Sequence, residues 1–232
     1  MANDNSTALP ASGYDAGVRC VIPFYDVIQA ETLDLVRSVA GEPKLWVDTG
    51  CGTGALIARA LDVFPRTQFV LADPSDGMLT QARARFANQF SARVKILPPT
   101  ASEGLPLIMP RLQAQVVTAM LCHHYHEPAG RLAAVRGCFE ILEPGGVLVV
   151  FENVDCDSSQ GRELGLHRWK EYQLQLGRTP AEVEHHIARF GTELKPIRVS
   201  EHLDVFRKAG FGVAELFWRA QMQAGFYAVK PA

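Results

Sequence analysis

The strongest chemical signal in the sequence is a glycine-rich segment that runs from Val47 to Gly54 and reads Val-Asp-Thr-Gly-Cys-Gly-Thr-Gly. Glycines let a backbone turn sharply and approach a ligand, and a helix that follows presents unpaired N–H groups to an anion. Gly50 to Ala55 also fits the Gly-x-Gly-x-x-Ala form of a dinucleotide fingerprint. The carboxylate of Asp48 disfavours a pyrophosphate there but suits a ligand that carries an ammonium group. The alternative is a tight turn that only packs a helix on a sheet.

A second acidic residue, Asp73, lies 19 residues beyond the last glycine of this segment, directly after an apolar run. An acid at that distance is placed to accept hydrogen bonds from the hydroxyls of a ribose. The alternative role is that of a helix N-cap, but Ser75 or Asp76 can fill it. We therefore favour the ribose role.

The segment Cys122-His-His-Tyr-His126 places three imidazoles and a thiol in one loop. These groups are good ligands for transition metals, but adjacent histidines on such a loop seldom converge on one ion, so we predict no metal site. A wall or a general base of a substrate pocket is the preferred interpretation, and plain packing is the alternative. A second pair, His185-His186, lies in a helical pattern, where a solvated face is expected and the mouth of a pocket is the alternative.

The elements that must position these residues alternate between strand and helix over residues 44–151. Such alternation predicts a parallel sheet covered by helices, with ligands beyond the carboxyl ends of the strands. The expected strands are 45–47, 68–72, 93–97, 114–120 and 147–151, and the expected helices are 24–40, 55–64, 76–90 and 128–142.

The rest of the chain departs from this alternation. Residues 158–191 are helical in pattern, 199–209 form a further helix, and 213–218 and 223–230 are strands joined by so short a link that they must be antiparallel. We predict one domain over residues 1–232. Its parts are an N-terminal helical region (14–40), a cofactor-binding core (44–151), a helical substrate lid (158–200), and a final helix with a β-hairpin (201–230).

The sequence resembles the class I S-adenosylmethionine-dependent methyltransferases in four segments, which occur in the same order along the chain. They are the glycine segment, the acid in Ala72-Asp-Pro-Ser-Asp-Gly-Met78, the 122–126 loop, and Leu142-Glu-Pro-Gly-Gly146. The resemblance implies a Rossmann-like, mostly parallel sheet of seven strands with an antiparallel last strand, helices on both faces, and a helical insertion after the fifth strand. The cofactor would be S-adenosylmethionine, with S-adenosylhomocysteine as the product. The residues that would bind it are Tyr25, Asp48, Gly50, Cys51, Gly52, Gly54, Asp73, Pro74, Ala101, Ser102, Met120 and Leu121.

Two further segments, Arg19 to Tyr25 and residues 158–191, are similar to the carboxy-S-adenosylmethionine synthases. The glycine segment departs from theirs, so we prefer in-line methyl transfer to a small acceptor. A carboxy-S-adenosylmethionine-type transferase and a non-catalytic cofactor-binding module remain alternatives. The candidate catalytic residues are His124, His126 and Tyr25, although Tyr25 could equally be a core tyrosine.

Composition sets the remaining expectations. The chain has 232 residues, 23 Lys and Arg against 25 Asp and Glu, and 47% hydrophobic residues. A net charge of −2 gives no basic footprint for duplex nucleic acid, and no apolar run is long enough to span a membrane. Five scattered cysteines without a Cys-x-x-Cys pair, and a polar start without a signal-peptide pattern, favour the cytoplasm. The expected partner is a small-molecule substrate, and the oligomeric state is open, with a homodimer among the alternatives.

Overall fold

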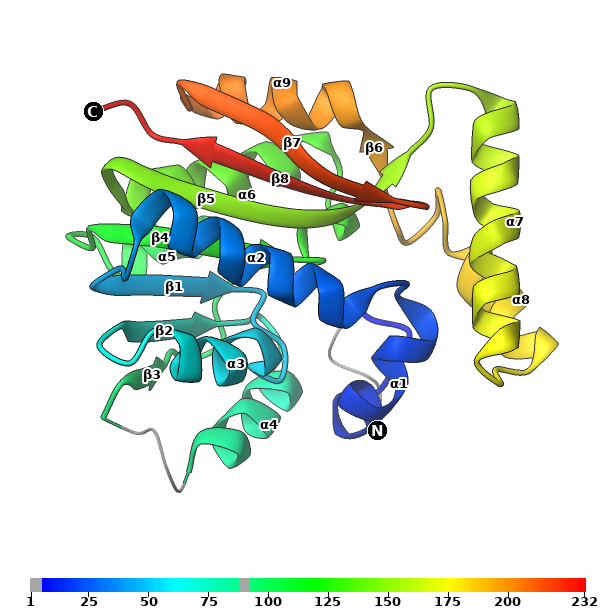
Figure 1. Ribbon diagram of the computed structural model, residues 1–232, viewed down its shortest axis with the longest axis horizontal. Coiled ribbons are helices and arrows are strands. Elements are labelled where there is room, and N and C mark those ends of the chain that lie inside the picture. The colour runs from blue at the N-terminus through cyan, green and yellow to red at the C-terminus, as the bar shows by residue number, and fades with distance from the viewer. Residues whose placement is uncertain (1–5, 88–91) are drawn as a thin grey trace.

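The computed structural model describes residues 6–87 and 92–232, and a mixed sheet lies at its centre (Figure 1). The main path of the sheet has the strand order β3-β2-β1-β4-β5-β8-β7, and a short β6 pairs with the end of β5. Strand β8 is antiparallel to both neighbours, and the other pairs are parallel. The bounds are β1 Leu45–Thr49, β2 Gln68–Ala72, β3 Val94–Ile96, β4 Ala114–Met120, β5 Leu142–Asp155, β6 Ile197–Arg198, β7 Val213–Ala220 and β8 Gln223–Val229. The predicted Rossmann-like α/β class is confirmed, with β6 as an additional strand.

Helices cover both faces of the sheet. Helices α2, α3 and α4 lie on one side, and α5, α6 and α9 lie on the other (Figure 1). Their bounds are α2 Tyr25–Ala40, α3 Ala55–Val63, α4 Asp76–Phe86, α5 Leu105–Ile108, α6 Pro128–Ile141 and α9 Val199–Ala209. Helix α4 ends at Phe86, before the predicted end at residue 90, and residues 88–91 lie outside the described part of the chain.

Strands β1, β2 and β4, and β5 from Val147 onwards, are largely buried on both faces, which explains their continuous apolar runs. Trp46 packs on the α2 and α3 side, whereas its neighbour Val47 packs on the α6 and α9 side. This alternation follows from the two-residue period of a strand. Asp48 and Thr49 therefore stand at the carboxyl edge of a fully covered sheet, where the chain turns into the glycine segment.

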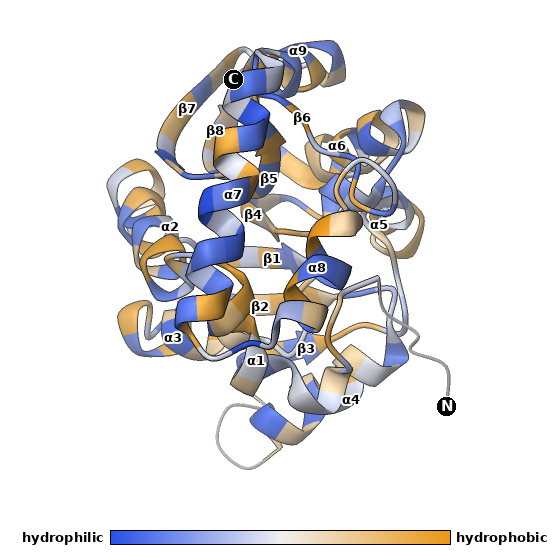
Figure 2. Ribbon diagram, turned by 90° about the vertical axis from the view of Figure 1, so that its right-hand side faces the viewer, coloured by the Kyte–Doolittle hydropathy of each residue, from blue (hydrophilic) through white to orange (hydrophobic). Residues whose placement is uncertain are grey.

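A third apolar cluster lies beyond the carboxyl ends of the strands. It joins α1 (Tyr14–Val21) to α7 (Ser159–Gln175) and α8 (Pro180–Ala188), the helices of the predicted lid, through side chains that include Val18, Trp169 and Val183. In Figure 2 the lid helices stand in front of the edges of the central strands, with α1 below them. The N-terminal helical region is therefore two helices, which separate at Phe24, whose φ of 60° is left-handed.

Within residues 6–87 and 92–232, we find no helix that combines the length and the apolar character needed to cross a bilayer.

Candidate functional site

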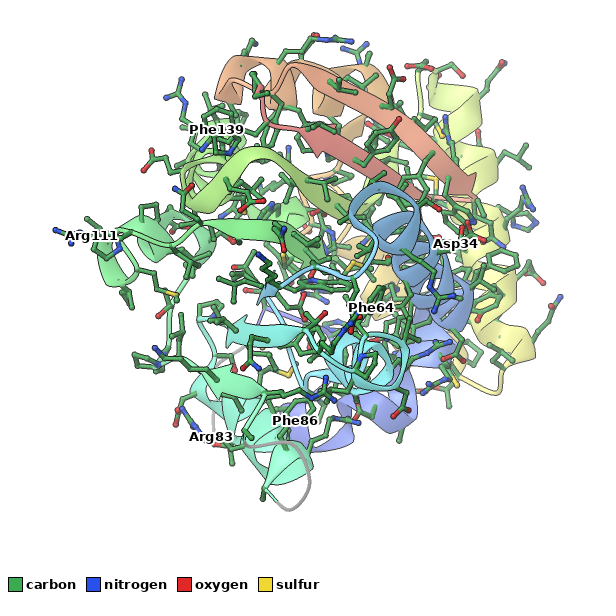
Figure 3. The ribbon with its side chains drawn as sticks, turned by 60° about the vertical axis from the view of Figure 1, so that its left-hand side comes forward. Asp34, Phe64, Arg83, Phe86, Arg111 and Phe139 are labelled. Atoms are coloured by element: carbon green, nitrogen blue, oxygen red, sulfur yellow. The ribbon has the colours of Figure 1, made fainter. Side chains whose placement is uncertain are left out.

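The glycine segment forms the turn between β1 and α3, and its glycines adopt left-handed backbone conformations. Gly50 and Gly52 have φ values of 61° and 55°. A Cβ on Gly50 would come within 2.4 Å of the Cβ of Cys122, whereas a Cβ on Gly52 would meet no atom within 4 Å. Gly54 packs against Phe86, which Figure 3 labels on α4. Gly50 thus lets two strand ends approach each other, and Gly52 leaves open space beside the loop.

That open space belongs to a cavity of about 710 Å³, which we call the main cavity. The main cavity is lined by eight of the residues that the sequence predicts to bind a cofactor. They come from four separate loops and are Gly50, Gly52, Asp73, Pro74, Ala101, Ser102, Met120 and Leu121. The structure therefore brings most of the predicted cofactor residues to one place.

Asp73 sits in the wall of the main cavity and is held by backbone N–H groups. Its Oδ2 accepts a hydrogen bond from Gly52 N at 2.9 Å, and its Oδ1 accepts one from Ser75 N at 2.9 Å. Ser75 caps α4, because its Oγ accepts from Met78 N at 3.0 Å. The N-cap role therefore belongs to Ser75, and Asp73 links the glycine segment to the loop after β2.

A second cavity, here called the helix cavity, lies between the glycine segment and α2. It is lined by Asp48, Cys51 and Tyr25 among others, so each predicted cofactor residue except Gly54 lines one of these two cavities. Asp48 is buried, and its Oδ1 accepts from Thr118 Oγ1 at 2.6 Å, which in turn accepts from Trp46 Nε1 at 2.9 Å. Burial raises the pKa of Asp48 to about 7, although the Thr118 hydrogen bond acts to lower it.

Tyr14 is a site residue that our sequence analysis missed. It lies at the start of α1 and lines the main cavity, the helix cavity and a third cavity under the lid. Its neighbour Asp15 fixes α1 to the glycine segment, because its Oδ1 accepts from Thr53 Oγ1 at 2.7 Å and its Oδ2 pairs with Arg85. Burial raises the pKa of the Tyr14 hydroxyl well above its usual range. An isolated tyrosine without an adjacent motif gave no sequence signal for this position.

The third cavity, the lid cavity, occupies about 420 Å³ and adjoins the main cavity. Thr7, Tyr14, Leu121 and Tyr125 line both. The rest of the lid cavity is an apolar surface with a few polar groups: Ala8, Leu9, Val18, Val21, Ile22 and Leu194 with His124, Asn153, His186 and Arg189. A ligand in the main cavity and one in the lid cavity would therefore meet at a shared wall.

The side chains of the three histidines in the 122–126 loop lie in different surroundings. His123 Nε2 lies 2.8 Å from Ser102 Oγ beside the main cavity, and burial lowers its pKa to about 4. His124 lines the lid cavity, and its Nδ1 lies 2.6 Å from Glu152 Oε2. His126 lines the main cavity and also an outer surface cavity beside α6. The loop is thus not one cluster, and of its histidines only His124 lines the lid cavity.

Glu152 is a second residue that the sequence analysis missed. It is fully buried near the end of β5, and its Oε1 also accepts from His123 N at 3.0 Å. Burial acts to raise its pKa, but the charge and the hydrogen bond of His124 bring the value down to about 2. Glu152 directly follows the predicted strand 147–151, so the signal that identified Asp73, an acid at the end of an apolar run, would also have found it.

Two further positions differ from expectation. His186 is buried, with 4% of its surface exposed, so the expected solvated face for this histidine is wrong, and its neighbour His185 is the exposed one. Tyr25 lines the helix cavity rather than the lid cavity, so it does not share a surface with His124. Burial raises the pKa of Tyr25 to about 12.

One group of described residues has spacing compatible with a metal ion. Ligand atoms of Cys122, His123 and Glu152 lie within 4.8 Å of one another. Both carboxylate oxygens of Glu152 already accept hydrogen bonds, and burial raises the pKa of the Cys122 thiol well above its usual range, which disfavours the thiolate that a metal needs. The chemistry of this donor set does not favour an ion.

Comparison with known proteins shows which families and folds this chain resembles. Residues 47–148 match a family model described as a methyltransferase domain. Carboxy-S-adenosyl-L-methionine synthase from Methylococcus capsulatus is 26% identical over 223 residues, which span 95% of this chain and 90% of that protein. The enzyme of the same name from Hydrogenovibrio crunogenus is 25% identical over 215 residues, or 90% and 82% of the two chains. These matches support the class I S-adenosylmethionine-dependent methyltransferase family that the sequence motifs predict. The relatives of this chain cover the N-terminal helices and the lid as well as the core.

Solved structures show how widely this methyltransferase shares its fold. A putative O-methyltransferase from Nostoc punctiforme superposes with a TM-score of 0.68 at 15% identity over 95% of this chain and 59% of that one. The chain thus spans less than two thirds of the length of this neighbour. The [4+2]-cyclase SpnF superposes with a TM-score of 0.61 at 18% identity over 87% and 80% of the two chains. The fold alone therefore leaves the reaction open.

Proposed function

We propose that this methyltransferase transfers a methyl group from S-adenosylmethionine to a hydroxyl of a small molecule, with S-adenosylhomocysteine as the product. The observation that carries the proposal is the buried pair formed by His124, which lines the lid cavity, and Glu152, which lines none of the three cavities itself and pairs with Nδ1 of His124. The lid cavity adjoins the main cavity, which is lined by most of the predicted cofactor residues. The arrangement supplies a place for the cofactor, a separate place for an acceptor, and a base beside the acceptor.

The residues of the main and helix cavities fit this cofactor. Gly52 leaves room for a ligand beside the backbone, and Asp73 presents a fixed carboxylate to ribose hydroxyls. Asp48 supplies a carboxylate near the open side of the glycine segment for the ammonium group, and Ala101 and Ser102 lie where the adenine would be bound. Met120 and Leu121 form the floor between these parts.

Catalysis by this chain rests on positioning and on one proton transfer. When bound, S-adenosylmethionine supplies a methyl group on a positively charged sulfur, which retains the electron pair of the broken S–C bond. In the tautomer in which Nδ1–H of His124 donates to Glu152, Nε2 carries the lone pair, and it would exchange its 3.4 Å contact with the Asn153 side-chain amide for the proton of the attacking hydroxyl. Tyr14 and the lid helix α8 cover the acceptor and exclude water. His126 and Tyr25, the other candidates, line neither the lid cavity nor any cavity shared with His124.

Calorimetry and a turnover assay test the proposal. We expect the protein to bind S-adenosylhomocysteine and not NADH, and to transfer a labelled methyl group to at least one member of a panel of phenols and aliphatic alcohols. Asp73→Ala should abolish cofactor binding, whereas Asp62→Ala, an exposed aspartate on α3, should leave it unchanged. Binding of NADH in place of S-adenosylhomocysteine would contradict the cofactor assignment.

A carboxy-S-adenosylmethionine-type transferase is a second candidate, because relatives of that name match 90% or more of this chain. The ligand that copurifies with the protein separates the two, since mass spectrometry distinguishes the carboxylated cofactor from the plain one. A non-catalytic module is the third candidate, and tight cofactor binding without transfer to any acceptor would favour it.

The five cysteines are free, which suits action in the reducing cytoplasm.

A further inference from the structure

His186 is a buried polar residue whose hydrogen bonding is incomplete. It lies near the end of α8, its ring packs edge-on against Trp169 with the centroids 5.0 Å apart, and it lines the lid cavity. Its Nδ1 is buried and has no hydrogen-bond partner among the residues that the structure describes. Buried polar atoms are nearly always paired, and an unpaired one destabilises the fold, so this atom calls for a partner that the described residues do not supply.

The surroundings of His186 define the charge of that partner. Burial lowers its pKa to about 3, and the cations of Arg178 and Arg189 act in the same direction, so the ring is neutral at physiological pH. The Arg189 guanidinium also lines the lid cavity, but it is paired with Glu193 at 2.8 Å and donates to the carbonyl of Ser6. A neutral imidazole beside an already paired arginine suits an uncharged hydrogen-bonding group better than an anion.

We propose that Nδ1 of His186 binds a second, uncharged polar group of the acceptor, a hydroxyl or a carbonyl. The inference rests on the proposed function, in which His124 in the same cavity takes the proton of the first hydroxyl. Because apolar side chains such as Val18, Ile22 and Leu194 form most of the remaining wall, the body of the acceptor is apolar. The substrate class is therefore a small dihydroxy or hydroxy-carbonyl compound, and His186 determines its specificity without taking part in the chemistry.

Binding of simple probes tests this substrate class. With the protein saturated with S-adenosylhomocysteine, calorimetry would compare phenol with 1,2-, 1,3- and 1,4-dihydroxybenzene and with the corresponding hydroxybenzaldehydes, which vary the spacing of the two groups. We expect at least one of these disubstituted probes to bind about tenfold more tightly than phenol, because only it satisfies the buried nitrogen. His186→Phe should remove this preference and His186→Asn should restore part of it. His185→Phe, at the exposed neighbouring position, should retain it.

Thermal unfolding distinguishes recognition from a structural role. His186→Phe keeps the ring against Trp169 and removes an unpaired polar atom, so its melting temperature should equal or exceed that of the wild type. A fall in melting temperature with the probe preference intact would overturn the proposal. So would a protein that binds S-adenosylhomocysteine but binds neither dihydroxybenzenes nor hydroxybenzaldehydes better than phenol. Failure to bind S-adenosylhomocysteine would instead refute the proposed function itself.

Discussion

Nδ1 of His124 lies 2.6 Å from Oε2 of Glu152, and both side chains are buried. His124 lies in the loop after β4, and Glu152 lies near the end of β5; the two strands are parallel neighbours in the sheet. A carboxylate on one imidazole nitrogen fixes the tautomer and leaves the other nitrogen as a base, as in other histidine-dependent enzymes.

Replacing this carboxylate should impair catalysis without impairing cofactor binding. We expect Glu152→Gln to lower kcat by about 10²-fold, the lower end of the usual contribution of a general base, because the tautomer of His124 is no longer fixed. The affinity for S-adenosylhomocysteine, measured by calorimetry, should change little. Glu215→Gln on the exposed face of β7 is the matched control. An unchanged kcat in Glu152→Gln would show that the Glu152 carboxylate does not assist the proposed base.

The open space beside Gly52 predicts a separable effect on binding. Gly52→Ala should weaken S-adenosylhomocysteine binding by about tenfold or more, because its Cβ would project into the main and helix cavities. Gly145 supplies the control, since its φ of 79° is also left-handed and its Cβ would also meet nothing within 4 Å. Both variants should lose about 1 kcal/mol of stability from backbone strain. Equal affinity in the two variants would mean that Gly52 does not face the cofactor.

The raised pKa of Asp48 predicts a pH dependence of cofactor affinity. Burial raises this pKa to about 7, so the carboxylate that would face the ammonium group is largely protonated below that pH. Because the cation favours the ionised form, S-adenosylhomocysteine should bind about tenfold more tightly at pH 8 than at pH 6. Asp48→Asn should bind more weakly and show a flat profile in calorimetry, and Asp62→Asn should behave as the wild type. A profile with the same slope in Asp48→Asn would exclude this role.

Buried histidines predict that acid destabilises the fold. Burial lowers the pKa of His202 to about 4, below its unfolded value of about 6.5, so the unfolded chain binds the extra proton between these values and stability falls as the pH decreases from 6.5 to 4. His202→Phe retains stacking on Phe226 and should reduce the slope of unfolding free energy against pH by about 1.4 kcal/mol per pH unit. His123 and His186 act in the same direction, and Asp48 opposes them.

Denaturant unfolding at several pH values between 4.5 and 6 measures this slope. His185→Phe, which removes an exposed histidine, should leave the slope close to that of the wild type. If the slopes of His202→Phe and the wild type coincide, the imidazole of His202 does not carry the proposed proton linkage.

The sequence by itself determined most of the architecture. Strands 68–72 and 114–120 and helix 199–209 agree with β2, β4 and α9 residue for residue, because each combines a clear apolar period with a turn or capping residue at its end. The glycine segment and Asp73 were identified because a tight strand-to-helix turn and an acid after a strand are local patterns. The region of the main and helix cavities therefore followed from local order along the chain.

The tertiary structure decided which side chains meet. Glu152 pairs with His124 only because β4 and β5 are adjacent, and Tyr14 lines three cavities only because Asp15 fixes α1 to the glycine segment. His186 and His185 are neighbours in sequence, yet the packing of α8 on Trp169 buries one and exposes the other. These contacts are between residues far apart in the chain. Local periodicity predicts which face of a helix or strand is buried, but it does not predict which other element packs against that face.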